Sequence, residues 1–479
     1  MITFLICLGL LITAYFTYGR YLEKKVGVDS KAKTPCERLY DGIDYVPLPR
    51  WRVFLIQLLN IAGTGPIFGA ILGACFGPVA FLWITFGGIF MGAMHDFLSG
   101  MMLVRNDGLS IPEVVGNYLG NGMRQFMRVF SVLLLILVGA VFLLSPAQLL
   151  GNMTPAVSTT VWVWIILAYY FIATLLPIDK IVGRVYPIFG VALVLMALGL
   201  MGAMFYGEYT GAYHMPEMTT FHNFQLDPEK LPIVPTLFIT IACGAISGFH
   251  ATQSPLMARC VKNERECRSV FYGAMISESV IALVWAAVAM TFFGGAGELS
   301  QALADNGGSA AWAVDTISNG MLGVAGGILA LLGVVAAPIT SGDTAFRSAR
   351  LIIADMLKID QKKKLKRLYI CIPLFVIGYG ITLVDFDVVW RYFAWTNQTL
   401  ATIVLWSIVI YMVRLRSNRW LAFFPAVFMT YICSSFIFIS HQFLGMTNHS
   451  LAYGLGAVVT LLITGLMYRK MRQEDHKQL

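Results

Sequence analysis

Thirteen stretches of about 20 mostly apolar residues recur along the chain, separated by short polar segments. A helix needs about 20 apolar residues to cross a hydrocarbon core of roughly 30 Å, so each stretch predicts one membrane-spanning helix. The pattern therefore predicts an all-α polytopic membrane protein. The predicted helices cover residues 2–18, 53–75, 77–104, 124–147, 157–176, 186–206, 233–257, 269–294, 317–342, 367–384, 389–412, 419–440 and 449–469.

Two of these helices are interrupted near their middle by residues that weaken a helix. The helix 53–75 contains NIAGTGPIFGAILG (60–73), and the helix 233–257 contains GAISGFHATQSP (244–255). Proline removes a backbone donor, glycine permits unwinding, and a free backbone group in lipid costs several kcal/mol. Each interruption must therefore face protein or a wet cavity. For one such helix taken alone, a proline kink at a tight helix contact is an equal alternative.

The two interrupted helices open two runs of five predicted helices, 53–206 and 233–412. Because five is odd, the two runs have opposite orientations in the membrane. Paired broken helices in two inverted halves predict a secondary transporter of the leucine-transporter fold, with its site near the bilayer midplane. The rest of the chain is an N-terminal helix and cytoplasmic segment (1–52), an outer loop (207–232), and two peripheral helices with a cytoplasmic tail (413–479).

The distribution of lysine and arginine predicts which side of the membrane each loop faces. With an outer N-terminus, 32 of the 34 lysines and arginines fall on the inner side, and only Lys230 and Arg391 do not. The net charge of +8 therefore reflects the positive-inside rule and not nucleic-acid binding. The first helix has neither a basic segment before it nor a small-residue cleavage pattern after it, so it is not a cleaved signal peptide. Thirteen crossings place the C-terminus in the cytoplasm.

Polar residues inside a membrane are costly, and those at the two interruptions are the candidates for substrate binding. Backbone amides at the start of a half-helix can hold a carboxylate, and neighbouring side chains can donate or accept hydrogen bonds. For Asn60 and Gln253 the alternative is to satisfy unwound backbone, and for Asn397 and Gln398 it is to link helices. The predicted substrate-binding residues are Asn60, Gly63, Thr64, Gly65, Ser247, His250, Thr252, Gln253, Asn397 and Gln398.

The sequence APITSGDTAFRSAR (337–350) ends the fourth predicted helix of the second half and predicts a cation site. In the leucine-transporter fold this helix lies against the first broken helix and supplies hydroxyl ligands to sodium, whereas a carboxylate there can carry a proton. The coupling ion is therefore H⁺ or Na⁺. The alternative role for Asp343 is to cap an inner helix, 344–357. The predicted ion-coupling residues are Ala62, Thr340, Ser341, Asp343 and Thr344.

Three further ionisable residues, His95, Asp96 and Glu278, form either a proton relay or a structural pairing. The eight cysteines are scattered without a CxxC motif, and the histidines lack metal-ligand spacing, so neither a disulfide nor a transition-metal site is expected. Phosphate-binding loops and the common hydrolase motifs are absent from the sequence. The chain is therefore not expected to be an enzyme, to need a cofactor or to be driven by ATP.

Five ordered segments carry a resemblance to a known family. They are ERLYDGIDYVP (37–47), NIAGTGPIFGAILG (60–73), GGIFMGAMHDFLSGMMLVRNDG (87–108), ACGAISGFHATQSP (242–255) and SGDTAFRSARLIIADML (341–357). Together they resemble the carbon starvation protein A family, in a short form without the extended C-terminal region of its long members.

The resemblance implies a transporter in a prokaryotic inner membrane that imports peptides or small carboxylates such as pyruvate during carbon starvation. It also implies coupling to a cation gradient, with protons favoured for the pyruvate-type members. The expected partners are this small-molecule substrate and the lipid bilayer, without nucleic acid. The alternative is a membrane nutrient sensor whose transporter-like core only binds its ligand.

Overall fold

The computed structural model describes residues 1–42, 44–175, 186–219, 221–359 and 364–477, and the regular structure of these residues is entirely helical. Nine helices in this part of the chain are long and apolar enough to cross a membrane, and a bent pair, α4 and α5, makes a tenth candidate. The predicted all-α polytopic class is confirmed. The nine are Ile2–Val26, Val79–Arg105, Asn121–Met153, Ile188–Thr210, Glu264–Phe293, Ala310–Leu357, Phe386–Arg414, Trp420–Ile439 and His449–His476.

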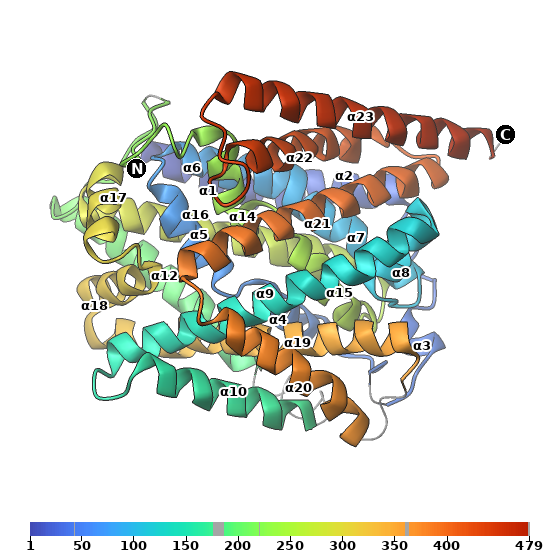
Figure 1. Ribbon diagram of the computed structural model, residues 1–479, viewed down its shortest axis with the longest axis horizontal. Coiled ribbons are helices and arrows are strands. Elements are labelled where there is room, and N and C mark those ends of the chain that lie inside the picture. The colour runs from blue at the N-terminus through green and yellow to red at the C-terminus, as the bar shows by residue number, and fades with distance from the viewer. Residues whose placement is uncertain (43, 176–185, 220, 360–363, 478–479) are drawn as a thin grey trace.

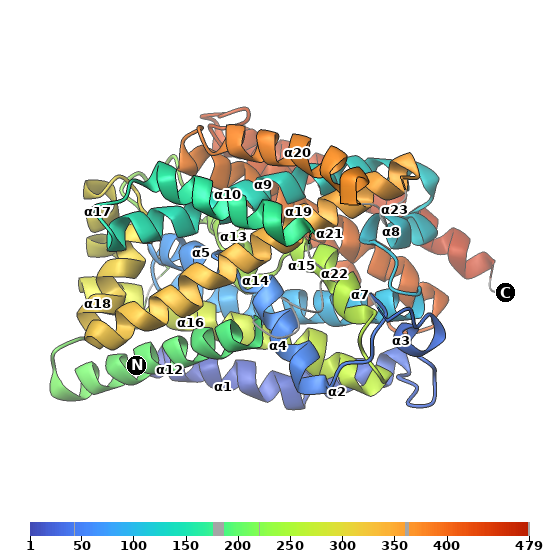
Figure 2. The ribbon, with the colours of Figure 1, turned by 90° about the horizontal axis from the view of Figure 1, so that it is seen from below.

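Most helices run along one common direction, and the two termini lie at opposite ends of it (Figures 1 and 2). The N-terminus lies at the same end as α17 (Ala296–Asp305). The C-terminus lies at the other end, together with α2 (Tyr18–Val26), α3 (Pro35–Arg38) and α8 (Ile111–Leu119). We call these the N-terminal and C-terminal ends of the molecule.

The interior is built by long helices that pack side by side. In this packing α19 lies along α9, α10 and α20 lie beside each other, and α22 contacts both α21 and α23. The predicted helix 157–176 corresponds to α10, and its residue 176 lies outside the described residues. The bounds are α1 (Ile2–Phe16), α6 (Val79–Leu82), η1 (Trp83–Ala93), α7 (Met94–Arg105), α9 (Asn121–Met153), α10 (Thr159–Leu175), α12 (Tyr186–Thr210), α16 (Gly273–Phe293), α20 (Lys364–Ile381), α21 (Phe386–Arg414), α22 (Trp420–Ile439) and α23 (His449–His476).

The first interruption is a real break. Helix α4 (Arg50–Ile61) and helix α5 (Gly65–Ala74) meet at an angle of 49°. Between them Ala62 has φ −84° and ψ 59°, and the amide of Gly63 donates to the carbonyl of Ile61 at 3.0 Å. These values describe an inverse γ-turn, which satisfies one amide while it redirects the chain.

The second interruption is also a break, and it is longer. It divides the chain into α13 (Phe238–Thr240), α14 (Ala242–Ala245) and α15 (Gly248–Ala258). Ile241, with φ −90° and ψ 66°, has nearly the same conformation as the turn residue of the first break. Residues 246–247 are fully extended before α15 begins. This segment is therefore interrupted twice, at Ile241 and at the extended residues 246–247, whereas the first segment is interrupted once.

The two breaks lie against each other inside the protein. A Cβ atom at Gly65 of the first segment would lie 2.5 Å from the Cβ atom of Cys243 in the second. Gly248 of the second segment packs as closely on α21, because a Cβ atom there would lie 2.5 Å from the carbonyl oxygen of Asn397. Real Cβ atoms do not approach so closely, so glycine permits both contacts. The unwound backbone is therefore covered by protein, as the cost of free polar groups in lipid requires.

The predicted helix 317–342 differs from the structure. Helix α18 (Ala310–Leu329) is broken at Gly323, where φ is 57° and ψ −142°, and after the short η5 (Ala330–Val335) the chain continues as α19 (Ala336–Leu357). The helix therefore does not end near residue 340. Asp343 lies inside α19 and is not an N-cap, so the capping alternative is wrong.

Candidate functional site

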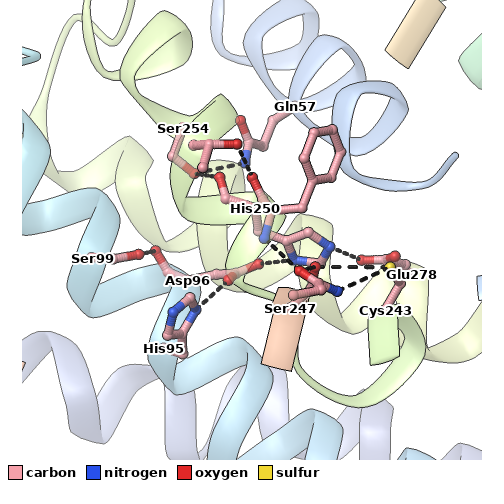
Figure 3. Close-up of polar contacts among 12 residues, drawn as sticks. Gln57, His95, Asp96, Ser99, Cys243, Ser247, His250, Ser254 and Glu278 are labelled. Carbon is pink, nitrogen blue, oxygen red and sulfur yellow. Dashed lines mark hydrogen bonds and ion pairs between the residues drawn. The ribbon is translucent and has the colours of Figure 1, made fainter. Parts of the chain in front are cut away.

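Four ionisable side chains form a continuous polar chain in the interior (Figure 3). Asp96 receives His95 Nδ1 on one carboxylate oxygen and His250 Nδ1 on the other, each at 2.8 Å. His250 Nε2 then lies 3.2 Å from an oxygen of Glu278. All four side chains have an exposed fraction of 0%. We call this set the buried acid–imidazole chain.

Close helix packing brings these residues together from α7, α15 and α16. A Cβ atom at Gly92 would overlap the carbonyl of Ala245, and one at Gly244 would overlap the methyl group of Ala282. The unwound second break therefore presses against the segment that leads into α7 on one side and against α16 on the other. This close approach puts His250 between Asp96 and Glu278.

Both hydrogen bonds of Asp96 go to the Nδ1 atom of a histidine ring, and with Asp96 ionised each of these nitrogens carries a proton. An ionised carboxylate only accepts, so Asp96 takes a proton-bearing Nδ1 from each of His95 and His250. His250 Nε2 is consequently left to face Glu278. Two acids beside two imidazoles can balance their charges, which a group buried in a low-dielectric interior requires. The sequence analysis noted each residue separately, and the structure joins them.

Asn397 is bound to the backbone of the second break. Its Oδ1 accepts from Ser247 Oγ at 3.1 Å and from the amide of Phe249 at 2.7 Å. Gln398 acts in the same way, because its Nε2 lies 3.3 Å from the carbonyl of Phe238 and 3.2 Å from that of Ala242. These contacts support the alternative that both amides link helices, and a substrate contact stays a prediction.

Thr252 and Gln253 lie inside α15 and are buried. The Thr252 hydroxyl donates to the carbonyl of Phe249 at 2.6 Å and accepts from Gln253 Nε2 at 3.1 Å. The Oε1 atom of Gln253 has no hydrogen-bond partner among the described residues. Gln253 therefore keeps an acceptor for another molecule, whereas Thr252 is already occupied.

Asn60 is the polar side chain at the first break that the protein leaves unsatisfied. It is the next-to-last residue of α4, it is fully buried, and neither its Oδ1 nor its Nδ2 has a partner in the described part of the chain. Thr64 accepts from Ser145 Oγ at 3.3 Å, and Gly63 lies against the ring of Phe142. An unpaired buried amide costs about 1–3 kcal/mol, which a bound ligand would offset.

The predicted ion-coupling residues divide between two places. Ser341 Oγ donates to the carbonyl of Leu59 at 3.0 Å, so α19 does lie against the first broken helix near Ala62. Asp343 instead lies 3.4 Å from Arg347 in a buried pair. The hydroxyls of Thr340 and Thr344 donate to carbonyls of their own helix.

A cavity of about 280 Å³ is lined in part by Ser300 and Leu303 of α17, the helix at the N-terminal end of the molecule. Its lining includes Leu72, Thr240 and Trp390, and the carbonyl of Thr240 also lies against Gly69 of α5. The cavity therefore reaches the backbone of both broken helices. Sequence reasoning missed this cavity, because its walls come from five helical segments that are distant in the sequence and from the loop 225–231.

At the C-terminal end, Arg105 ties several segments together. Its guanidinium donates to both oxygens of Glu264, at 2.9 and 2.8 Å, and to the hydroxyl of Tyr411 at 3.0 Å. It also donates to the carbonyls of Val26 and Gly27. One side chain thus fastens four separate segments, and we call this group the Arg105 clasp. The sequence shows only isolated charges at these positions.

Comparison with solved structures shows which known fold the chain shares. The chain superposes on MhsT, crystallised in complex with L-phenylalanine, with a TM-score of 0.56 and 13% identity over 90% of this chain and 99% of that one. A manganese transporter of Eremococcus coleocola matches with a TM-score of 0.52 and 11% identity over 91% and 99%. The fold is therefore that of the leucine-transporter-like membrane transporters.

The chain belongs to the carbon starvation protein CstA family, whose model matches residues 1–161 and 147–330. An uncharacterized membrane protein of Haemophilus influenzae is 43% identical in an alignment that covers 64% of this chain and 94% of that protein. The predicted family is thereby confirmed.

Two relatives from Escherichia coli have assigned activities. The peptide transporter CstA is 26% identical over 58% of this chain, and the pyruvate/proton symporter BtsT is 28% identical over 57%. The matches cover 48% and 46% of those two proteins, so the chain spans about half of their length. These relatives and the structural neighbours are transporters rather than enzymes.

Proposed function

We propose that this protein is a secondary active transporter that imports a small organic solute during carbon starvation. The solute is a peptide or a small carboxylate such as pyruvate, the activities named for its two E. coli relatives. The observation that carries the proposal is the direct contact between the two helix breaks at Gly65 and Cys243, with the unsatisfied Asn60 beside the first break.

In this proposal the segments 53–206 and 233–412 are two inverted repeats of five helices each. Movement of one repeat against the other opens the central site to either face of the membrane in turn. The substrate contacts Asn60, Thr64 and the amides that begin α5, which suit a carboxylate because a helix N-terminus is electropositive. On the second break, Gln253 offers its unpaired acceptor.

We further propose that the protein lies in a prokaryotic inner membrane, with the N-terminus outside and the C-terminus in the cytoplasm. The positions of the two termini at opposite ends of the molecule support this orientation. The lysine- and arginine-rich α2 lies at the C-terminal end, as the positive-inside rule requires of a cytoplasmic face. The cavity beside Thr240 is then the outer access route.

Two places suit the two possible coupling ions. Protons would use the buried acid–imidazole chain, whose groups can hold and pass them. Sodium would use the contact of α19 with α4, where the Ser341 hydroxyl and backbone carbonyls near Ala62 offer hard oxygen ligands. Asp96→Asn should abolish proton-driven uptake, and Ser341→Ala should abolish sodium-driven uptake.

The test uses purified protein in liposomes under an imposed inward proton or sodium gradient, with labelled pyruvate or a labelled dipeptide outside. We expect one of these solutes to accumulate inside above its outer concentration, and an ionophore that dissipates the gradient to prevent it. Binding without accumulation under either gradient would identify a sensor instead and would reject the transport proposal.

A further inference from the structure

Three potential metal ligands converge beside the second break. The Sγ atom of Cys243, the Nε2 atom of His250 and a carboxylate oxygen of Glu278 all lie within 4.8 Å of one another (Figure 3). Cys243 precedes the extended residues 246–247, His250 follows them, and Glu278 comes from the adjacent α16. The three donors therefore come from the two helices that flank the extended residues and from the neighbouring α16.

The donors of this trio are buried without adequate protein partners. His250 Nε2 and both oxygens of Glu278 have no hydrogen bond from any described residue, although both side chains are fully buried. The 3.2 Å approach of Nε2 to Glu278 is close enough for an ion pair but is not aligned as a hydrogen bond. Leaving buried donors and acceptors unpaired costs free energy, and one bound cation would pair His250 Nε2 and the Glu278 carboxylate together.

Asp96 completes the arrangement from outside the trio. Its oxygen lies 2.8 Å from His250 Nδ1, and with Asp96 ionised and Nδ1 protonated, the neutral ring keeps its lone pair on Nε2, the nitrogen nearest Glu278. Metal-binding histidines are held in this way, with a carboxylate on the ring nitrogen opposite the metal. The Cys243 thiol is also positioned, because Asn397 Nδ2 and Ser247 Oγ lie 3.7 and 3.8 Å from its Sγ atom.

The geometry points to a binding site for one divalent transition-metal ion of the zinc class, held by Cys243, His250 and Glu278. A thiolate with an imidazole selects such an ion over Mg²⁺, Ca²⁺ or Na⁺, which prefer oxygen ligands. Three protein ligands leave one position of a tetrahedron for an exchangeable ligand. A bound metal ion would join the two half-helices of the second break to α16. The inference goes beyond the transport proposal and stands without it.

This inference changes the expectation that the chain has no transition-metal site. Residues 243, 250 and 278 show no metal-ligand spacing that a local motif would carry. Only the unwinding of residues 246–247 and the approach of α16 bring the donors together.

The experiment titrates Co²⁺ into the purified full chain after chelator treatment and records absorption. We expect one Co²⁺ per chain, with a thiolate-to-cobalt charge-transfer band that Zn²⁺ abolishes on displacement. Cys243→Ser should remove this band and weaken Co²⁺ binding at least 10-fold. Asp96→Asn should keep the band and weaken binding about 10–100-fold, as is usual when the group that orients a ligand is lost. The matched control is Cys433→Ser, because Cys433 is a buried thiol on α22 whose Sγ atom lies 3.6 Å from the Thr402 hydroxyl.

Each result supports or overturns the proposed metal site when size-exclusion chromatography shows that the variant is folded. No Co²⁺ binding by the native chain would overturn the inference, and so would a charge-transfer band that survives Cys243→Ser or disappears in Cys433→Ser. If Cys243→Ser does not fold, Glu278→Gln takes its place: binding weakened at least 10-fold supports the site, and unchanged binding overturns it. Because no gradient or substrate is used, failure of transport has no bearing on this result.

Discussion

Gly65 and Cys243 are in contact, although one begins the half-helix after the first break and the other lies within the second. A Cβ atom at position 65 would lie 2.5 Å from the Cβ atom of Cys243, so glycine alone fits without movement. The two breaks are thus a single structure rather than two separate kinks.

Gly65→Ala should separate the two breaks. Overpacking of this kind costs about 1–3 kcal/mol, and we expect uptake to fall at least 10-fold while the protein stays folded. The control is Gly202→Ala on α12, where nothing lies within 4 Å of an added Cβ atom. The double variant Gly65→Ala, Cys243→Gly should recover part of the uptake. Full uptake by Gly65→Ala alone would remove this contact from the mechanism.

Asn60→Ala should impair function without impairing stability. Its amide is buried and unsatisfied, so its removal should leave the thermal unfolding temperature unchanged or higher. If the amide contacts substrate, KM for uptake should rise at least 10-fold. Uptake kinetics and thermal unfolding of the same preparation check both expectations. A lower unfolding temperature with an unchanged KM would mean that Asn60 is only structural.

Asp96→Asn should be severe, because it leaves two histidines without their carboxylate. Removal of one member of a buried ion pair costs about 3–5 kcal/mol. The neighbouring control is Ser99→Ala, which loses one hydrogen bond to the Asp96 carbonyl, worth about 1 kcal/mol. Thermal unfolding should separate the two variants clearly. Similar unfolding temperatures would show that the acid–imidazole chain is not held by charge pairing.

Arg105→Lys should loosen the C-terminal end, since lysine cannot reproduce the forked contact with Glu264. We expect the buried thiol of Cys267, in the same short segment as Glu264, to become reactive toward a maleimide. Arg38→Lys is the control, because its pair with Asp107 is partly exposed and worth at most about 1 kcal/mol. Equal labelling rates in all three proteins would show that the Arg105 clasp does not hold these segments together.

Glu217 should make stability depend on pH at the N-terminal end. Partial burial alone would raise its pKa, but the N-terminal ammonium and the Thr3 hydroxyl and amide lower the pKa to about 2. Because the folded pKa is the lower one, this stabilisation is present above the unfolded pKa of about 4.3 and is lost as the pH falls toward 2. Glu217→Gln should therefore unfold at a lower temperature than the native chain at pH 7, and the difference should shrink at about pH 3. A difference that does not change with pH would contradict this.

Local chemistry made the two breaks predictable. Glycine and proline interrupt NIAGTGPIFGAILG and GAISGFHATQSP in ways that the chain itself displays, and each break lies within its predicted helix. The end of α19 was not predictable from polarity, because the hydroxyls of Thr340 and Thr344 bond to their own helix and let a polar stretch remain helical.

The sequence did not predict that the residues of the buried acid–imidazole chain would meet. Asp96 and His250 are 154 residues apart, and their hydrogen bond depends on the close approach of Gly92 to Ala245. No spacing along the chain encodes that approach. The cavity beside Thr240 and the convergence of Cys243 with Glu278 depend on tertiary packing in the same way.

Accumulation of labelled pyruvate or dipeptide in proteoliposomes, measured for the native chain and Gly65→Ala in parallel under proton and sodium gradients, tests the central claim most directly. The account predicts that the native protein concentrates one solute under one gradient and that Gly65→Ala loses at least nine-tenths of this uptake, a 10-fold drop from an overpacked contact costing about 1.4 kcal/mol. Equal accumulation by both proteins, or accumulation by neither, would contradict it.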